Sequence, residues 1–386
     1  MRTAPCTRPP AGFRERGLSL VELLIATAIS LLLLTGLVTI FATSSQNQRE
    51  MQRSAQQIEN GRYAMDVLTQ DLHHAGYYGR YVPPAAGTTL PDPCITGDAT
   101  ALANALPFAV QAYIASSQTT KPDFSATSCA TYFTSTNLRA GSDILVVRRA
   151  ETSPLAVGST ATDAEVYIQA SPSSVDLHFG TATVLTTSNR ADGAAATVKK
   201  KDGTTAEEIR KYRVHIYFVA PCSIPSSGTT CTGASGEDTT PTLKRLELSA
   251  SGGVRSLTTV PLAEGIDALK IEFGIDNSPS ATNASTGMIG DGAPDVYVPS
   301  QTSTGPTAAD LGNAVSAKIF LIARNPEKTP GFTDTKVYPV ATPITSASGV
   351  SLNGTGLTYT FGDSYRRHAY NSEIRLQNLS SRRENP

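Results

Sequence analysis

The distribution of apolar and polar positions divides the chain into three segments of different character. Residues 18–42 form an almost continuous apolar run. Residues 43–76 are mostly polar but contain no proline, and residues 77–386 alternate short apolar runs with loops rich in Gly, Ser, Thr and Pro. This pattern predicts one long helix followed by a β-rich region.

The apolar run is long enough to cross a bilayer. Roughly 25 residues at about 1.5 Å per residue span about 37 Å, and the hydrocarbon core is about 30 Å thick. Arg2, Arg8, Arg14 and Arg16 precede the run, which predicts a cytoplasmic N-terminus and an external remainder. A cleaved secretory signal would have a shorter apolar core. A plain signal anchor would leave the carboxylate of Glu22 within the run unexplained.

The polar segment after the run continues the same helix. Its apolar positions recur every seven residues, with two more at adjoining positions of the same stripe: Met51, Ile58, Met65, Leu72, Ala55 and Leu68. We expect this stripe to cover a sheet and the helix to end at Gly76, its predicted C-cap. A coiled-coil seam is less favoured because the stripe is short and poor in Leu and Ile. His73 and His74 are adjacent on the helix and do not face one another, which argues against a metal site.

The remainder of the chain predicts an antiparallel β region. Candidate strands cover residues 143–149, 165–170, 175–179, 212–220, 243–249, 268–275, 316–324 and 372–379. Val214, Ile216 and Phe218 alternate with less apolar residues, so one face of that strand is expected to be the more apolar. The segments 82–140 and 276–315 read as long loops, which usually carry function or disorder.

Composition and motifs exclude several classes of function. The net charge of −1 and the absence of a long basic run argue against direct nucleic-acid binding. No G-x-S-x-G, H-E-x-x-H or P-loop sequence occurs, so neither catalysis nor a cofactor is expected. His178, His215 and His368 fall in or beside predicted strands, where hydrogen-bonded structural histidines are the expectation.

The cysteines indicate an oxidising compartment. Four of them, Cys94, Cys129, Cys222 and Cys231, follow the apolar run, and an even number suits disulfides. Three pairings are possible, and some thiols could instead stay free and buried. The most local pairing joins Cys94 to Cys129 and Cys222 to Cys231, with loop closures worth about 4 and about 3 kcal/mol. The strands flanking the second pair are expected to form a hairpin. No C-x-x-C spacing favours zinc.

Oxygen-bearing side chains gather near the second long loop. Asp276, Asn277, Asp291 and Asp295 could offer ligands to a hard cation such as calcium. The spacing is not that of an EF-hand, and the preference of Asp and Asn for turns explains it more simply. We therefore predict no metal, and keep the three aspartates as weak calcium candidates.

The sequence around Glu22 resembles a known processing site. "RERG" followed by "LSLVELLIA", at 14–26, is similar to the cleavage site of type IV prepilins, with the cut between Gly17 and Leu18. The resemblance implies that Leu18 is N-methylated and that Glu22 is the fifth mature residue. Gly17 would let a membrane peptidase approach the backbone closely. The new α-amine on Leu18 would meet the Glu22 carboxylate of a neighbouring subunit, or of its own first turn, which would set the register of assembly.

The resemblance narrows to one family further along. "ENGRYAMDVLTQDLHHAGYYGRY", at 59–81, is similar to minor pilins of the PilW family, as are "LAEGIDALKIEFGID" and "YRRHAYNSEIRLQNL" near the C-terminus. Arg80 stands where family members often have Cys, so Cys94 is a candidate for a displaced substitute.

The resemblance implies an α+β, type IV pilin-like fold, with a long N-terminal helix packed on antiparallel sheet. The expected organisation is a leader (1–17), a transmembrane and assembly helix (18–42), its periplasmic amphipathic half (43–76) and a β-rich periplasmic domain (77–386). A minor pilin of this kind takes part in type IV pilus assembly, in a priming or tip complex.

The implied partners are other minor pilins, the major pilin, prepilin peptidase and the inner-membrane assembly machinery. The precursor would cross the bacterial inner membrane once before entering the pilus. Two alternatives remain open: a J-type pseudopilin of a type II secretion system, and a signal-anchored periplasmic adhesin or enzyme.

Overall fold

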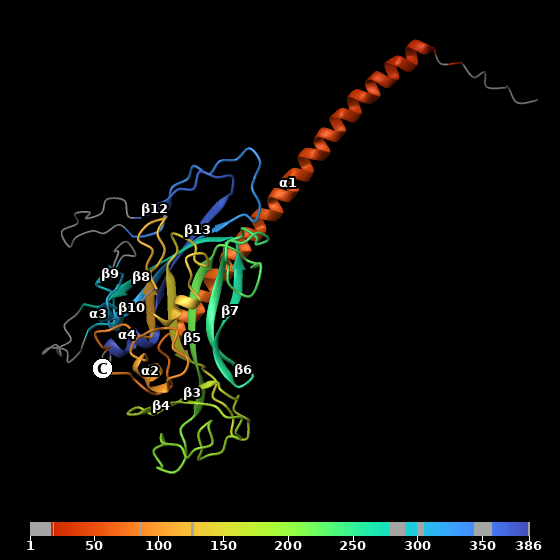
Figure 1. Cartoon of the computed structure of the whole chain (residues 1–386). Coiled ribbons are helices and arrows are strands. Elements are labelled where there is room, and N and C mark those ends of the chain that lie inside the picture. The colour runs from red at the N-terminus through yellow and green to blue at the C-terminus, as the bar shows by residue number, and fades with distance from the viewer. Residues whose placement is uncertain are drawn as a thin grey trace, which may run out of the picture. The chain divides into compact units, whose positions relative to one another are not determined.

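The computed structural model describes residues 17, 19–84, 86–124, 127–277, 290–298, 305–342 and 357–384. The chain divides into two compact units, Met1–Gln52 and Arg53–Pro386. The first unit consists of the N-terminal part of helix α1 (Leu20–His74), and the second contains the rest of that helix with the sheets (Figure 1).

The other elements all lie in the second unit. In chain order they are α2 (Ala99–Asn104), β1 (Val110–Tyr113), the 3-10 helix η1 (Ser128–Thr131), β2 (Ile144–Ala150), β3 (Val166–Ala170), β4 (Val175–Phe179), β5 (Ile209–Ala220), β6 (Thr242–Ser251), β7 (Val254–Glu264), β8 (Ile266–Ile275), β9 (Val296–Val298), α3 (Ala308–Gly312), β10 (Ala314–Arg324), β11 (Tyr338–Pro339), β12 (Thr358–Tyr359), β13 (Arg367–Arg375) and α4 (Gln377–Glu384).

The long helix predicted from the sequence is present, with a length of 55 residues. It starts where the Glu22 carboxylate accepts the backbone N–H of Ser19 at 3.1 Å, half of a capping box. It ends at His74, just before Gly76, whose φ of +72° is the left-handed conformation that stops a helix.

The face that α1 buries matches the predicted stripe only in part. Met51 and Ile58 are 66% and 44% exposed. Leu68 and Leu72 of the predicted stripe are buried, and Met65 packs against the core. The other buried positions lie outside the stripe: Gln57, Gly61, Ala64 and Asp71. Small residues dominate the middle of this face, and the ring of Tyr370 lies directly on Gly61, where a Cβ atom would overlap it. Close approach to the sheets, rather than side-chain apolarity, selected the buried face.

Two antiparallel sheets form the body of the second unit. The larger has seven strands, with β1-β2-β5-β3-β4 in order and β6 and β7 continuing from the other part of β5. The smaller has the order β13-β10-β8-β9, and β11 pairs with β12 separately. Ala64, Leu68 and Leu72 of α1 share one hydrophobic core with residues of both β2 and β8, such as Val147 and Ile271.

Strand β5 is buried on both faces, which the sequence pattern did not predict. Tyr217 and Val219 belong to the core beneath α1, whereas Ile216 and Phe218 belong to a second core. That second core is completed by the segment 82–140, which was expected to be a long loop. The segment instead contains α2, β1 and η1, and it contributes the contacting rings of Tyr113, Phe124 and Phe133.

The other predicted strands are present, except that the last one ends earlier than expected and one further strand, β7, was not predicted. β5 and β6 form the expected hairpin around Cys222 and Cys231, with Ala220 opposite Thr242. The predicted strand 372–379 ends at Arg375, and Gln377–Glu384 form helix α4 instead. β7 was not predicted; it pairs with β6 along its length and has mostly polar or half-exposed positions. The predicted loop 276–315 lies partly outside the described residues, and its described part holds β9 and α3.

Candidate assembly site

The residues implicated in processing lie at the start of α1. Leu18, the predicted site of cleavage and methylation, lies outside the described residues. Gly17 is exposed, and a Cβ atom there would have no heavy atom within 4 Å. Glu22 is also exposed, and its carboxylate accepts the Ser19 N–H. The structure thus gives Glu22 a local capping role, to which the predicted role in subunit register would be added.

The first part of α1 exposes an apolar surface. By length and composition, α1 is the one helix among the described residues that could cross a membrane, and its most apolar stretch is not buried within the chain. The hydroxyls of Thr27, Thr35, Thr39 and Thr43 each donate to a carbonyl three or four residues earlier. These side chains therefore leave no polar group that needs water.

A buried carboxylate fixes the other end of α1 to the larger sheet. Asp71 is 5% exposed and faces side chains from two adjacent strands. Arg149 Nε of β2 donates to Oδ1 at 2.6 Å, and Tyr217 OH of β5 donates to Oδ2 at 3.0 Å. His215 Nδ1 lies 2.8 Å from Oδ2. The register of β2 and β5 places these three side chains on the same face, so one aspartate ties the helix to both strands.

The charges around Asp71 keep it ionised. Burial alone raises the pKa of its carboxyl, but the interactions with His215 and Arg149 outweigh burial and hold the pKa well below its usual range. The carboxylate therefore persists at neutral pH, fully engaged with protein donors. A buried ion with these partners makes removal of any one of them costly.

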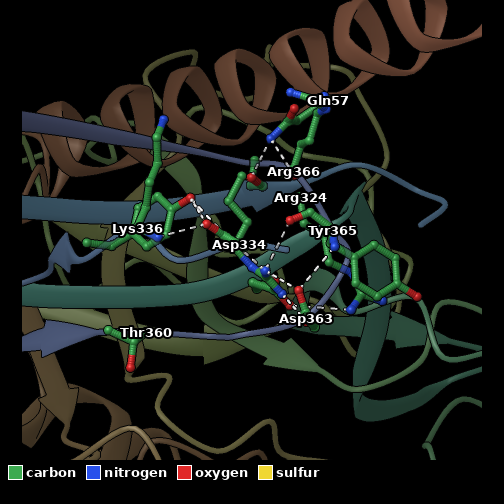
Figure 2. A network of polar contacts seen from close by, with 12 residues as sticks. Gln57, Arg324, Asp334, Lys336, Thr360, Asp363, Tyr365 and Arg366 are labelled. Carbon is green, nitrogen blue, oxygen red and sulfur yellow. Dashed lines mark hydrogen bonds and ion pairs between the residues drawn. The ribbon is translucent and has the colours of Figure 1, made fainter. Parts of the chain in front are cut away.

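Gln57 fixes the helix to the smaller sheet, near the start of the second unit. Its Nε2 donates to the carbonyl of Ala323 at 2.7 Å and to that of Arg366 at 3.1 Å. Figure 2 shows Gln57 reaching from the helix toward Arg366. Ala323 lies in β10 and Arg366 immediately precedes β13, so a single amide holds two neighbouring strand ends against α1.

The strand ends that receive Gln57 are themselves stiffened by an ionic network (Figure 2). Arg367 is buried and bonds to three carboxylates: Asp267 at 2.6 Å, Asp334 at 3.1 Å and Asp363 at 2.6 Å. Its guanidinium also lies 3.7 Å from the centroid of the Phe361 ring. Because several partners constrain one rigid guanidinium, this region gives Gln57 a defined surface to bind.

Side chains of helix α4 bind the backbone just after the C-terminal end of α1. Asn378 Nδ2 donates to the carbonyl of Ala75 at 3.0 Å, and Arg382 donates to the carbonyl of Gly76 at 2.7 Å. Ala75 and Gly76 directly follow α1, so α4 holds the turn in which the helix ends. The helix is therefore held at its start in the second unit, along its buried face and at its end.

The disulfides join Cys94 to Cys129 and Cys222 to Cys231, the local pairing considered from the sequence. The first closes the segment that forms the second core, and the second closes the tip of the β5–β6 hairpin. Asn137 Oδ1 accepts the Cys231 N–H at 2.8 Å, which links the two regions. Arg80, at the position where PilW members often have Cys, contacts Glu207 at 3.5 Å.

The weak calcium candidates are engaged by protein donors. Asp276 is buried, pairs with Arg383 Nε at 2.7 Å and accepts the Gly292 N–H at 3.0 Å. Asp291 and Asp295 accept backbone N–H groups at 2.8 and 2.7 Å. Over the part of the chain that the structure describes, one group of ligand atoms is close enough for a metal, that of Asp92 with Cys94 and Cys129. Its cysteines form a disulfide.

The five histidines have ordinary surroundings. His73 is exposed, and His74 Nδ1 lies 2.7 Å from the Gln70 carbonyl. His178 Nε2 accepts the Ala191 N–H, and His368 lies edge-on to Tyr370. His215 differs from the other four histidines because its side chain contacts Asp71, which fixes α1 to the larger sheet.

The polar anchors of α1 were missed from the sequence. A signal existed: Asp71 interrupts the apolar face between Leu68 and Leu72, and a carboxylate at a core position requires buried partners. Gln57 offered no such signal, because glutamine is common on exposed helix surfaces.

Helix, anchors and sheets together define a class of protein. A long N-terminal helix, apolar in its first part, packs its polar second part onto antiparallel sheets, the architecture expected of a pilin-like α+β protein.

Comparisons with known proteins are more specific. Residues 229–378 match the sequence model of the PilW family, type IV pilus-assembly protein W. The chain therefore carries a PilW-family segment, which extends from the tip of the β5–β6 hairpin to the start of α4. This confirms the family expected from the sequence. Comparison with curated proteins finds no match.

A solved structure is also similar: a type IV-like pilin, TTHA1219, from Thermus thermophilus. It has 10% sequence identity and a TM-score of 0.29, with coverage of 84% of this chain and 97% of that chain.

Proposed function

We propose that the chain is a minor pilin that is cleaved after Gly17 and enters a type IV pilus through α1, as part of a priming or tip complex. The observation that carries the proposal is the continuity of α1. One helix starts beside the processing motif, runs through an exposed apolar stretch and ends as a buried element of the domain that carries the PilW match.

The organisation proposed for the chain follows from this role. Residues 1–17 are the leader, 18–42 anchor the precursor in the inner membrane, 43–76 extend the helix into the periplasm and 77–386 form the exposed domain. The partners are prepilin peptidase, other minor pilins, the major pilin and the inner-membrane assembly machinery.

Glu22 has two tasks in this proposal. In the precursor it caps the first turn through Ser19. After cleavage the positive α-amine of Leu18 appears beside the same turn, and an ionised carboxylate has acceptor capacity for both donors. A neighbouring subunit whose α-amine reaches Glu22 would be held at one axial register.

The anchors of α1 explain how assembly could act on the whole subunit. Force applied to the docked part of the helix in a filament would reach the sheets through Gln57, Asp71 and the packed core. This is a mechanical reason for buried polar contacts at both ends of the docked part of the helix.

Processing is tested by N-terminal sequencing of the protein expressed with and without a prepilin peptidase. We expect the mature chain to begin at Leu18, with its α-amine methylated, only when the peptidase is present. Gly17→Ala should block or strongly slow cleavage, whereas Gly36→Ala, also free of atoms within 4 Å, should not. An intact leader in the presence of active peptidase would exclude the proposal.

The role of Glu22 is tested with two variants. Glu22→Gln keeps an oxygen acceptor for the Ser19 N–H but loses the charge, and Glu22→Ala loses both. We expect both variants to be cleaved and both to be nearly absent from sheared pili. Normal entry of Glu22→Gln into pili would show that capping, not charge pairing, is the function of this residue.

The rival roles predict different deletion phenotypes. Loss of a pilus-priming subunit should reduce pilus number while protein secretion continues. Loss of secretion with normal piliation would instead identify a J-type pseudopilin, and loss of neither would favour a signal-anchored adhesin or enzyme.

A further inference from the structure

A cavity of about 440 Å³ lies beside the end of α1, in a region that the proposed assembly role does not use. We call it the Tyr77 cavity. Its lining comes from four separate parts of the chain: residues 77–80, β3, the loop 200–202 and residues 207–210. Its volume falls within the range of about 300–1,000 Å³ typical of small-molecule sites.

The walls of the Tyr77 cavity are held in place by the fold. Gly79 has a φ of +69°, and a Cβ there would lie 3.8 Å from Arg210 Nε, so the turn after α1 stands close to β5. Arg210 donates to Glu208 Oε2 at 2.5 Å and to the carbonyl of Glu151 at 3.3 Å, and its guanidinium lies 5.6 Å from the Tyr77 ring centroid.

The loop that supplies the lysines is equally ordered. Lys200 N–H donates to the Thr205 carbonyl at 2.8 Å, and Gly203 N–H donates to the Lys200 carbonyl at 2.9 Å. The Thr205 hydroxyl and the backbone amides of Thr204 and Thr205 lower the pKa of Asp202 to about 2. The Asp202 carboxylate is thus committed to its own turn, and the neighbouring lysines are presented on a defined hairpin.

The lining carries an uneven set of charges. Lys200 and Lys201 are exposed, and their ammonium groups form no hydrogen bond or ion pair within the described part of the chain. Arg80 is 67% exposed and meets Glu207 only at 3.5 Å. Arg210 is the fourth cation of the lining and pairs with Glu208 at 2.5 Å. Three carboxylates line the cavity: Asp202, the buried Glu207 and the half-exposed Glu208.

The presence of both ammonium groups and carboxylates in the lining favours some classes of ligand over others. A compact anion such as phosphate would be attracted by the lysines but repelled by the buried Glu207 carboxylate, whose ion pair with Arg80 is long at 3.5 Å. A neutral ligand would form no ion pair with the two lysines. An acidic sugar fits both features, because its carboxylate pairs with ammonium groups while its hydroxyls donate to carboxylate oxygens.

We propose that the Tyr77 cavity binds an acidic saccharide of the uronic acid class. The sugar carboxylate pairs with Lys200 and Lys201, and its hydroxyls donate to Glu207 and Glu208. Tyr77 and Ala170 provide the apolar surface against which the ring lies. This inference stands apart from the role in pilus assembly, since no step of that role involves the cavity.

The test is a titration of the full chain in detergent micelles, followed by saturation-transfer difference NMR, with empty micelles as background. The ligands are digalacturonic acid, its dimethyl ester and inorganic phosphate. We expect the acid to bind at least about tenfold more tightly than the ester, the difference that one charge-assisted pair makes. Phosphate should not compete with it.

Variants of one loop supply the matched control. The double variant Lys200→Gln, Lys201→Gln should weaken binding of the acid about tenfold, while Lys199→Gln, next to them but outside the cavity lining, should leave it nearly unchanged. The three positions are exposed, so the melting temperature should stay constant.

Four results would overturn the proposal. They are the absence of saturation transfer to the acid, equal binding of acid and ester, effective competition by phosphate, and an equal loss of binding in Lys199→Gln.

Discussion

The two parts of α1 meet their surroundings in opposite ways. In residues 20–52 the long apolar side chains are exposed, and the threonine hydroxyls bond to carbonyls of their own helix. In residues 53–74 the buried face carries small residues together with Gln57 and Asp71, whose side chains bond to the sheets. The apolar side chains of the first part have no partners within the described residues of the chain, whereas the second part packs against its own domain. A single helix can thus serve two environments when its polar groups are satisfied differently in each.

The largest effect is expected when the charged anchor is removed. Asp71→Asn keeps the shape of the side chain but leaves Arg149 without its counter-charge, which should destabilise the domain by about 3 kcal/mol. Denaturant unfolding of the full chain in detergent, followed by near-ultraviolet circular dichroism, measures the loss. Asp66→Asn, on the same helix but exposed, is the control and should change stability by less than about 0.5 kcal/mol. An equal loss of stability in the two variants would show that Asp71 does not anchor α1.

The same anchor predicts how stability depends on pH. The pKa of Asp71 in the folded protein is depressed below 3.8, the usual pKa of an aspartate, so the carboxylate stabilises the fold at pH values above 3.8. This contribution is lost as pH falls below 3.8 toward the folded pKa. The stability difference between the parent protein and Asp71→Asn should therefore be constant above about pH 5 and should shrink at lower pH. A difference that grows on acidification would contradict the assignment.

A smaller effect is expected from the uncharged anchor. Gln57→Ala leaves the carbonyls of Ala323 and Arg366 without the Gln57 donor, at a cost of about 2 kcal/mol. The neighbouring Gln56 is exposed, and Gln56→Ala should be nearly neutral. Hydrogen exchange should show faster opening at the start of β13 in the Gln57 variant only.

Two glycines of the same helix provide the smallest and most direct contrast. Gly61→Ala places a Cβ against the Tyr370 ring, which should destabilise the domain by about 1 kcal/mol despite the better helix propensity of alanine. Gly36→Ala meets no atom within 4 Å, so it should be neutral or slightly favourable to helix formation. If overlap with the ring is the cause, Gly61→Ala should cost nothing in a Tyr370→Ala background.

Much of the architecture could be predicted because it depends on local patterns. The length of α1, its end near Gly76, the β5–β6 hairpin and several strands follow from periodicity, glycine and cysteine spacing that neighbouring residues suffice to specify. The PilW-type motifs near Asn60 and in the C-terminal region pointed to the family whose model matches residues 229–378.

The rest depended on surfaces that are distant in sequence. Met51 and Ile58 looked like the buried stripe, but Gly61 and Ala64 allow the closer approach to the sheets, and only the partner surface decides between the two faces. Segment 82–140 looked like a loop because its apolar residues are scattered. These apolar residues form a core only because they pack against the face of β5 that points away from α1.

The sequence by itself determined that the chain has a long helix, an apolar N-terminal stretch, a processing motif and a β-rich remainder. These properties reside in the order of neighbouring residues. The tertiary structure alone decided which face of α1 is buried and that Asp71 and Gln57 bond this face to the sheets. It also decided that four separate segments form the Tyr77 cavity. Such features depend on which distant side chains meet, because burial and charge pairing are properties of contacts rather than of single residues.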